Sequence, residues 1–560
     1  MRVPTSLSAA LEALRDETED VLVWADSMCI NQRSNRDKTQ QLPLIPEIYS
    51  KAEQVVVWLG VEKDDSEQAQ ELLHSLVTDE VQLSPLLDLG SVVSLFDREF
   101  WSRLWVVQEV LHAQEIVVLC GSSRLPWDDY VRASMIFQSP DSVDKIRFFN
   151  ERSGNTRLVT SQHRLNPSQI LIHHGPASIL HIQRARELAR EENRVDDLHY
   201  TLHLMRLSRT KLASDPKDRV YGILGVLPRG LSPEIRVNYN LTVKEIYVDF
   251  VEWWMKASGS LNIICDSIHF PPQISNANLP SWVPDWSYDP TTQSLASLPL
   301  KFSASGESSS EYYFPDREDG RGPRLRNKLA IAGVRIGEIS DHGTAVNTHC
   351  RAADYCMTFL QWRALLLQHF DIDAGSESHS EDRRRRVALC EHQRSFCLTL
   401  SLGQPVGTDR AKKDSKFLDS EKSWVEKCYS VFATVIKARL PRLPIDEDLM
   451  AFEEAGDDIK PDSPRQFLQD NFAEYMMGRC FCITDSGSLG LGSGAMARGD
   501  VVVVPYGCST PVLLRPEGFG APDADGQRVQ EYRFVGDAYI DGHMYGEAME
   551  HGSREEFILH

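Results

Sequence analysis

Short apolar runs alternate with helix-like segments over the first 130 residues. The runs at residues 21–26, 54–59 and 115–120 are compact and rich in β-branched side chains, which favours buried strands. Apolar side chains spaced three and four residues apart predict four helices, at residues 6–17, 37–52, 67–78 and 100–113. Pro43 and Pro46 fall inside the second of these helices, so we expect it to begin late or to be kinked.

The order of these elements predicts an α/β domain over residues 1–130. Strand, helix and strand over residues 21–59 make a βαβ unit, whose strands are parallel and whose crossover is right-handed. The remaining helices and the strand at 115–120 extend it to a doubly wound parallel sheet. Ligands bind such sheets beyond the carboxyl ends of the strands. Functional side chains are therefore expected just after residue 26.

The rest of the chain divides into a helical middle region and an α+β region. Residues 131–300 carry mostly helical spacing, and residues 301–325 are rich in Ser, Gly and charge, as in a linker or exposed loop. Residues 326–560 form the α+β region, in which residues 374–386 read as a solvated polar insertion. From about residue 465 the pattern changes to short strands.

A glycine-rich segment in this last region has two interpretations. Gly490, Gly492 and Ala495 fit the spacing G-x-G-x-x-A, which in dinucleotide-binding folds opens a helix. Here the glycines lie between predicted strands at 479–484 and 500–505, and no helix pattern follows them. We therefore expect hairpin glycines and no bound cofactor.

Composition and charge narrow the class of protein. Hydrophobic residues make up 42% of the chain and charged residues 25%, which is typical of folded globular proteins. A net charge of −21 argues against sequence-blind binding of nucleic acid or of an anionic membrane. The apolar runs are too short to span a bilayer, which takes about 18–20 residues. We expect a soluble, cytoplasmic protein.

The cysteines do not indicate a disulfide framework or a metal site. There are 11 of them, an odd number, and they are scattered along the chain. Reduced thiols are the expected state. The one close pair, Cys480 and Cys482, lies in an alternating apolar segment and lacks the four ligands that a structural zinc site needs.

Polar residues follow the predicted strand at 21–26. Asp26, Asn31 and Gln32 occupy the place where an α/β sheet binds its ligand. Asp and Asn also cap helices and shape turns through their own side chains. Both interpretations, a ligand site and a turn, stand at this point.

A second group of candidate residues lies on the predicted helix at 100–113. Trp105 and Glu109 are four residues apart and share a helix face. Burial of a carboxyl group beside an indole ring would raise its pKa toward a value useful in acid–base or electrostatic work. The alternative is a helix packed by its tryptophans, with Glu109 paired to Arg103 or Arg98.

Three blocks of sequence resemble the heterokaryon incompatibility (HET) domain of filamentous fungi. That family usually reads Trp-Ile-Asp-Ala-hydrophobic-Cys-Ile-Asn-Gln, then Ile-Tyr-x-x-Ala-x-x-Val-x-x-Trp-Leu-Gly, then Arg-x-Trp-x-x-Gln-Glu. The matching residues of this chain are Trp24, Asp26, Cys29, Ile30, Asn31, Gln32, Lys38, Gln40, Ile48, Tyr49, Ala52, Val55, Trp58, Leu59, Gly60, Arg103, Trp105, Gln108 and Glu109.

Further blocks extend the resemblance over most of the chain. Residues 214–225 match a downstream Asp-Pro-Arg-Asp-Lys-Val-Tyr segment, in which we expect Asp215, Asp218 and Arg219 to form a local capping or ion-pair cluster. The family normally opens with a strand ahead of the helix at 6–17, and this sequence shows no such strand. By this pattern we expect an N-terminally truncated relative of the family.

The resemblance implies a function and a site. HET proteins take part in fungal nonself recognition and trigger programmed cell death, through protein partners or self-association. Their fold is regarded as similar to the Toll/interleukin-receptor (TIR) domain, some members of which cleave NAD with a glutamate in a Trp-x-x-x-Glu pattern. By this analogy Glu109 is the catalytic residue, supported by Trp105, and Asp26, Asn31, Gln32 and Arg103 line the cleft. The alternatives are a NAD glycohydrolase, with NAD as substrate only, and an inactive family member.

Overall fold

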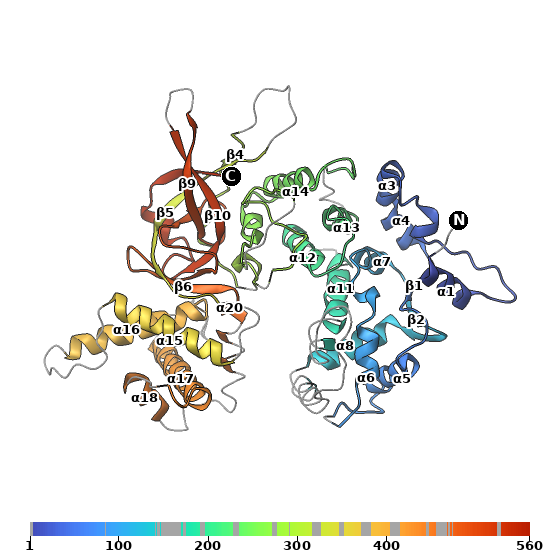
Figure 1. The fold of residues 1–560 in the computed structure, drawn as a ribbon, viewed down its shortest axis with the longest axis horizontal. Coiled ribbons are helices and arrows are strands. Elements are labelled where there is room, and N and C mark those ends of the chain that lie inside the picture. The colour runs from blue at the N-terminus through green and yellow to red at the C-terminus, as the bar shows by residue number, and fades with distance from the viewer. Residues whose placement is uncertain are drawn as a thin grey trace. The chain divides into compact units, whose positions relative to one another are not determined.

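The chain forms two compact units (Figure 1). The first contains Met1–Trp253 and Trp286–Asp289, and the second contains Trp254–Asp285 and Pro290–His560. The computed structural model describes residues 4–84, 86–139, 142, 146, 170–171, 175–190, 197–227, 235–270, 277–290, 292–298, 300–315, 326–346, 352–370, 382–403, 415–443, 447–454, 467–468, 471–472, 474–522 and 528–560. The first unit thus extends beyond the domain expected over residues 1–130 and takes in the helices up to Trp253.

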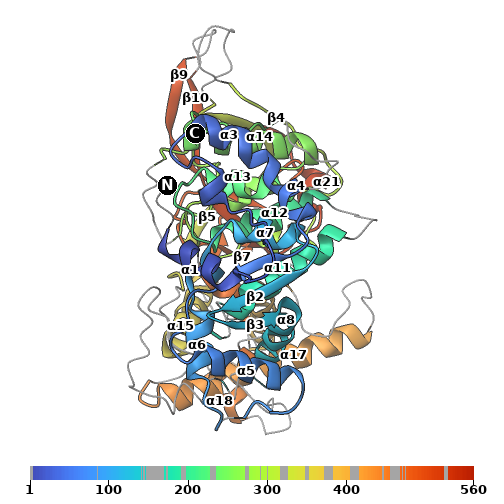
Figure 2. The ribbon, with the colours of Figure 1, turned by 90° about the vertical axis from the view of Figure 1, so that its right-hand side faces the viewer.

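A small three-stranded sheet lies in the first unit. Strands β1 (Val55–Trp58) and β2 (Ile116–Cys120) pair in parallel, and β3 (Ser123–Pro126) runs antiparallel to β2. Figure 2 shows β2 and β3 beside helix α8 (Trp127–Gln138). The predicted strands at 54–59 and 115–120 are confirmed, and so is their parallel pairing.

The predicted strand at 21–26 is wrong. Residues 21–25 have no regular structure, and a four-residue helix, α2 (Asp26–Cys29), begins where the strand was expected to end. The side chain of Leu22 is fully exposed, and those of Val21 and Val23 are exposed as well. In the described part of the chain, β2 is the one strand that pairs with β1, so residues 21–25 have no ladder to join. The βαβ unit over residues 21–59 is therefore not formed.

The helices around this sheet follow the apolar spacing closely. The expected kink near Pro43 is confirmed, because a 3-10 turn (Leu42–Leu44) separates two helices there. The predicted helix at 100–113 is divided, since a 3-10 turn (Glu99–Ser102) precedes its regular part. The helices up to this point are α1 (Thr5–Leu14), α3 (Asn35–Gln41), α4 (Ile45–Lys51), α5 (Ser66–Val77), α6 (Gly90–Phe96) and α7 (Val106–His112).

Aromatic side chains fill the core of the first unit. Trp101 is buried and its ring centroid lies 5.5 Å from that of Tyr130 and 6.3 Å from that of Trp127. At the end of the unit, Trp286 packs on Tyr247, with 4.8 Å between ring centroids. The remaining helices here are α11 (Gly175–Arg190), α12 (Asp197–Arg209), α13 (Asp218–Leu224) and α14 (Val243–Ser258).

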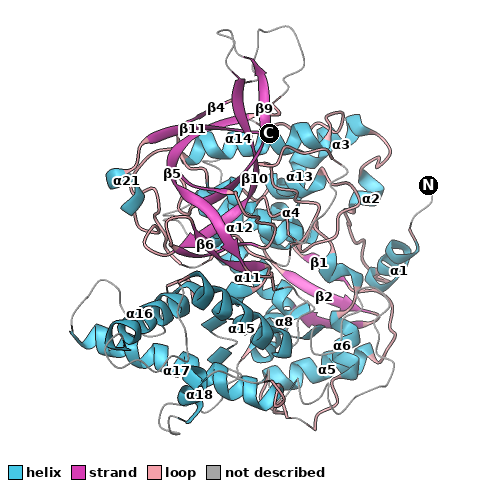
Figure 3. Cartoon of the chain, turned by 60° about the vertical axis from the view of Figure 1, so that its left-hand side comes forward, coloured by secondary structure: helices cyan, strands magenta, loops and turns pink. Residues whose placement is uncertain are grey.

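The second unit is built on a β-barrel (Figure 3). Strand β5 (Leu329–His342) pairs with β8 (Val501–Pro505), and the order continues through β9 (Val512–Pro522), β10 (Arg528–Ile540), β7 (Leu489–Ser493) and β6 (Arg479–Thr484) back to β5. These six strands close a ring without free edges. Strand β11 (Arg554–Leu559) also bridges β10 and β5, and β4 (Tyr312–Tyr313) pairs with β5.

Long helices pack on the barrel through aromatic contacts. Phe359 stacks on Phe432 with 3.8 Å between centroids, and Phe396 meets Phe481 of β6 edge-on at 5.1 Å. Helices and barrel thus share one core. The helices are α15 (Ala352–His369), α16 (Asp382–Leu400), α17 (Ser415–Arg439), α18 (Glu447–Glu454), α20 (Glu474–Met476) and α21 (Glu547–His551), with 3-10 turns at Asn262–Asp266 and Leu295–Ser297.

The second unit can be compared with several predictions made from the sequence. Gly490 and Gly492 lie within β7, in a hairpin with β6, so the hairpin interpretation is confirmed. Cys480 and Cys482 are buried in β6, as expected of strand cysteines. Of the expected linker or exposed loop at 301–325, residues 301–315 are described. They are mostly loop and turn, and Phe302 among them is buried in the core. Of the expected polar insertion at 374–386, residues 374–381 lie outside the described residues, and residues 382–386 belong to α16.

Candidate functional site

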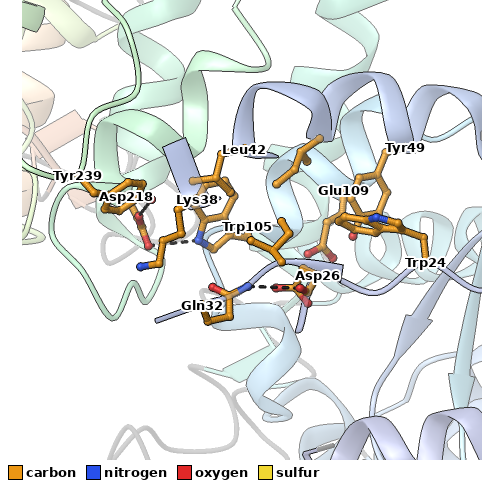
Figure 4. Close-up of a pocket in the computed structure, with 12 residues that line it drawn as sticks. Trp24, Asp26, Gln32, Lys38, Leu42, Tyr49, Trp105, Glu109, Asp218 and Tyr239 are labelled. Carbon is orange, nitrogen blue, oxygen red and sulfur yellow. Dashed lines mark hydrogen bonds between the residues drawn. The ribbon is translucent and has the colours of Figure 1, made fainter. Parts of the chain in front are cut away.

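A pocket in the first unit collects side chains from four separate parts of the sequence (Figure 4). Its cavity volume is about 60 Å³, and it is open to solvent on one side. The segment around α2 lines it, together with helices α3 and α4, the start of α7, and the start of α13 with the loop that follows. The lining residues are Trp24, Asp26, Ile30, Gln32, Lys38, Leu42, Ile45, Tyr49, Trp105, Glu109, Asp218 and Tyr239.

Glu109 is the most perturbed carboxyl group of this pocket. It lies in the first turn of α7, and in the described part of the chain its side chain accepts no hydrogen bond and forms no ion pair. Burial raises the pKa of Glu109 to about 7, a shift that the charge of Arg103 opposes and the charge of Asp26 reinforces. Near neutral pH the group therefore exists in both its charged and its neutral form.

Two aromatic side chains stand beside Glu109, with Asp26 close by. Figure 4 shows Trp24, Tyr49, Glu109 and Asp26 gathered at one end of the pocket, called here the Glu109 end. The rings of Trp24 and Tyr49 meet edge to face at 5.7 Å. Burial raises the pKa of Tyr49, and the charges of Glu109 and Asp26 raise it further, so the phenol keeps its proton.

The opposite end of the pocket is held together by Asp218, and we call it the Asp218 end. The indole Nε1 of Trp105 donates to Oδ2 of Asp218 over 3.3 Å, and the hydroxyl of Tyr239 donates to Oδ1 over 2.5 Å. The ammonium group of Lys38 lies 4.6 Å above the centre of the Tyr239 ring. Burial is the main cause of a raised pKa at Asp218.

The structure brings four of the six predicted site residues together. Asp26, Gln32, Trp105 and Glu109 line the pocket, and Gln32 donates from Nε2 to the carbonyl of Asp26 over 3.4 Å. Whether they bind a ligand stays a prediction. The other two residues, Asn31 and Arg103, are not among the lining residues.

Asn31 and Arg103 have other surroundings. The side-chain oxygen of Asn31 accepts from the backbone N–H of Arg33, which supports the interpretation of a turn-shaping residue. Arg103 is exposed and acts on Glu109 through its charge alone. The ion pair of Glu109 with Arg98 is not formed, because the Arg98 guanidinium donates to the backbone carbonyl groups of Val61 and Lys63.

Sequence reasoning missed the contribution of the segment at 215–240. Asp215 accepts from the backbone N–H of Lys217 over 3.0 Å, as the capping interpretation expected. Arg219, however, donates to backbone carbonyl groups of Ser208 and Lys211 and does not pair with Asp218. Asp218 turns into the pocket instead, and nothing in its local sequence spacing relates it to Trp105.

Comparison with known proteins identifies the class. The sequence profile described as "Heterokaryon incompatibility protein (HET)" matches residues 1–109, which include Asp26, Trp105 and Glu109, and the profile described as "Het-6 beta-barrel domain" matches residues 463–560. The second range covers β6 to β11, five of whose strands belong to the closed ring. The chain is therefore a heterokaryon incompatibility (HET) domain-containing protein.

A curated relative matches over the full length of the chain. The protein named "Heterokaryon incompatibility protein 6, OR allele" from Neurospora crassa is 25% identical over 633 aligned positions, which cover 100% of this chain and 87% of the relative. No solved structure matches the chain. Among the described residues, no helix is both long and apolar enough to cross a membrane, and no three His, Cys, Asp or Glu side chains are grouped as metal ligands would be.

Proposed function

We propose that this protein acts in fungal nonself recognition and in signalling that leads to programmed cell death. One observation carries the proposal. The similarity to the Neurospora crassa incompatibility protein extends over the whole chain, so it includes the HET domain, the barrel and the residues between them. A shared arrangement of that length supports a shared role more strongly than a match to one domain would.

Induced expression in a filamentous fungus tests this role. Hyphae that carry the gene are fused with strains that carry different versions of it, and dead cells are counted with a dye that enters only broken membranes. We expect death in fusions between unlike strains and survival in fusions between like strains. Equal survival in all fusions, with the protein present by immunoblot, would contradict the proposal.

We further propose that the protein works in the cytoplasm through protein partners or self-association. The exposed apolar side chains of Val21, Leu22 and Val23 support a contact surface, because exposed apolar clusters commonly mark such sites. Light scattering at rising protein concentration tests it. Leu22→Ser is expected to lower the apparent mass, whereas Val529→Ser, which changes an exposed apolar residue of the second unit, is the matched control.

Cleavage of NAD and a TIR-like doubly wound arrangement stay predictions. The support for a catalytic Glu109 is its unpaired, half-buried carboxyl group at the pocket, with Trp105 four residues before it. Release of nicotinamide from NAD by the wild type and by Glu109→Gln tests the prediction. A rate above background that falls by at least about a hundredfold in the variant would support it, since acid–base groups typically contribute that much. Background release by both proteins would contradict it.

A further inference from the structure

The two ends of the pocket have the same side-chain chemistry. The Asp218 end combines a carboxyl group with the rings of Tyr239 and Trp105. The Glu109 end combines the carboxyl groups of Asp26 and Glu109 with the rings of Trp24 and Tyr49. Carboxylates attract cations, and the faces of aromatic rings attract them as well through their quadrupole. Both ends are therefore suited to a positive charge.

The Asp218 end already holds a positive charge, which the chain itself supplies. The Lys38 ammonium group lies over the face of Tyr239, at a distance typical of cation–π contacts. Its charge also lowers the pKa of Asp218, against the effect of burial. An aromatic ring and a carboxylate of this pocket thus already interact with an ammonium group, which belongs to the chain itself.

The Glu109 end has no such internal cation among the residues that line it. Lys38 is the one basic side chain in the lining, and Figure 4 shows it at the other end. The charge of Arg103 reaches Glu109, but the Arg103 side chain is exposed and is not part of the pocket wall. Two carboxyl groups, those of Asp26 and Glu109, thus face a pocket that aromatic rings also line.

We propose that the Glu109 end binds an organic cation, a ligand with a quaternary or otherwise alkylated ammonium group. Apolar side chains of Ile30 and Ile45 also line the pocket, and they suit a cation with carbon substituents. A bare metal ion would need several oxygen ligands instead, and no cluster of three such residues is present among the described residues. The proposal goes beyond the role in nonself recognition and does not depend on it.

A pair of probes of equal shape tests the charge requirement. Choline and its uncharged analogue 3,3-dimethyl-1-butanol are titrated into the full chain, and binding is followed by calorimetry and by tryptophan fluorescence, because Trp24 and Trp105 line the pocket. We expect choline to bind about tenfold more tightly than the alcohol, the size typical of one well-placed cation–π contact. Equal affinities, or no binding of choline at millimolar concentration, would overturn the proposal.

Substitutions at the two ends separate binding from folding. Glu109→Gln and Trp24→Leu are each expected to weaken choline binding about tenfold, whereas Tyr49→Phe keeps the ring and is expected to bind as the wild type does. Lys38→Met removes the internal cation and is expected to gain affinity or a second bound choline at the Asp218 end. A loss of choline binding in Lys38→Met, in protein with the wild-type melting temperature, would contradict the proposal, because removal of the internal cation should not weaken the binding of a cation.

Discussion

At the scale of single residues, Glu109 couples the pocket to pH. Its ordinary pKa of 4.5 applies in the unfolded chain, and burial raises the pKa to about 7 in the folded protein. Between these values the folded state keeps a proton that the unfolded state has lost. The contribution of Glu109 to the free energy of unfolding is therefore complete below about pH 4.5 and is lost as the pH rises through 7. The groups that act on Glu109 by charge are Arg103 and Asp26, which oppose each other.

We predict that Glu109→Gln removes this loss. The free energy of unfolding is measured with urea at pH 5 and pH 8, and the wild type is expected to lose about 1 to 2 kcal/mol more than the variant, because partial exposure screens the shift. Glu53→Gln, at an exposed position, serves as the control and should behave as the wild type. The same pH slope in wild type and Glu109→Gln would contradict the assigned burial.

A second prediction concerns the buried ion pair of the barrel. Arg479 donates from Nη2 to Oδ1 of Asp537 over 2.8 Å, and both side chains are at most 5% exposed. Asp537→Ala leaves the guanidinium buried without its partner, which typically costs about 3–5 kcal/mol. Glu311→Ala breaks the pair with Arg554, in which both side chains are more than half exposed, and should cost less than about 1 kcal/mol. Chemical denaturation monitored by fluorescence checks the difference, and equal costs would contradict it.

At the scale of elements, strand pairing decided where the sequence-based prediction succeeded. The apolar runs at 54–59 and 115–120 became β1 and β2, because each found the other as a partner. The run at 21–26 has a similar composition and yet stays outside the sheet. Strand propensity describes which side chains suit a pleated, half-buried surface, and it does not supply the neighbouring strand. The segment at 100–113 shows the complementary case, since local spacing was sufficient to predict a helix that contains Glu109 and has Trp105 as its N-cap.

The Asp218 end of the pocket could not be predicted from local sequence patterns. Trp105 and Asp218 are 113 residues apart and meet only because α13 packs near α7. A hydrogen bond between two helix starts leaves no periodic trace in either segment. Local patterns did indicate Asp26 and Glu109, which line the pocket, although the strand expected before Asp26 is not formed.

Hydrogen exchange tests the corrected strand assignment. We predict slow exchange of the backbone amides of Val55–Trp58 and Ile116–Cys120, because their hydrogen bonds are buried in the ladder, and fast exchange of residues 21–25, which have no ladder bonds. Mass spectrometry of peptides after brief labelling resolves the three segments. Protection of residues 21–25 to the level of β1 would show that they pair with another strand in solution.

At the scale of the whole molecule, the two units have separate cores. The aromatic cluster around Trp101 serves the first unit, and the cluster around Phe359 and Phe481 serves the second. We predict two transitions in scanning calorimetry, of which Asp537→Ala lowers one only. A matched change in the first core, Trp101→Phe, should lower the other. A single transition that moves with either substitution would contradict the prediction.

The chain passes between the units more than once, and this has a consequence for inheritance. Residues 254–285 belong to the second unit, yet Trp286–Asp289 return to the first, where Trp286 packs on Tyr247 and Phe250. A single recombination breakpoint after Trp253 would give one parent's Tyr247 and Phe250 to the other parent's Trp286. Variants of the two units therefore cannot be shuffled cleanly by one crossover, and we expect natural alleles to exchange these three aromatic positions as a set.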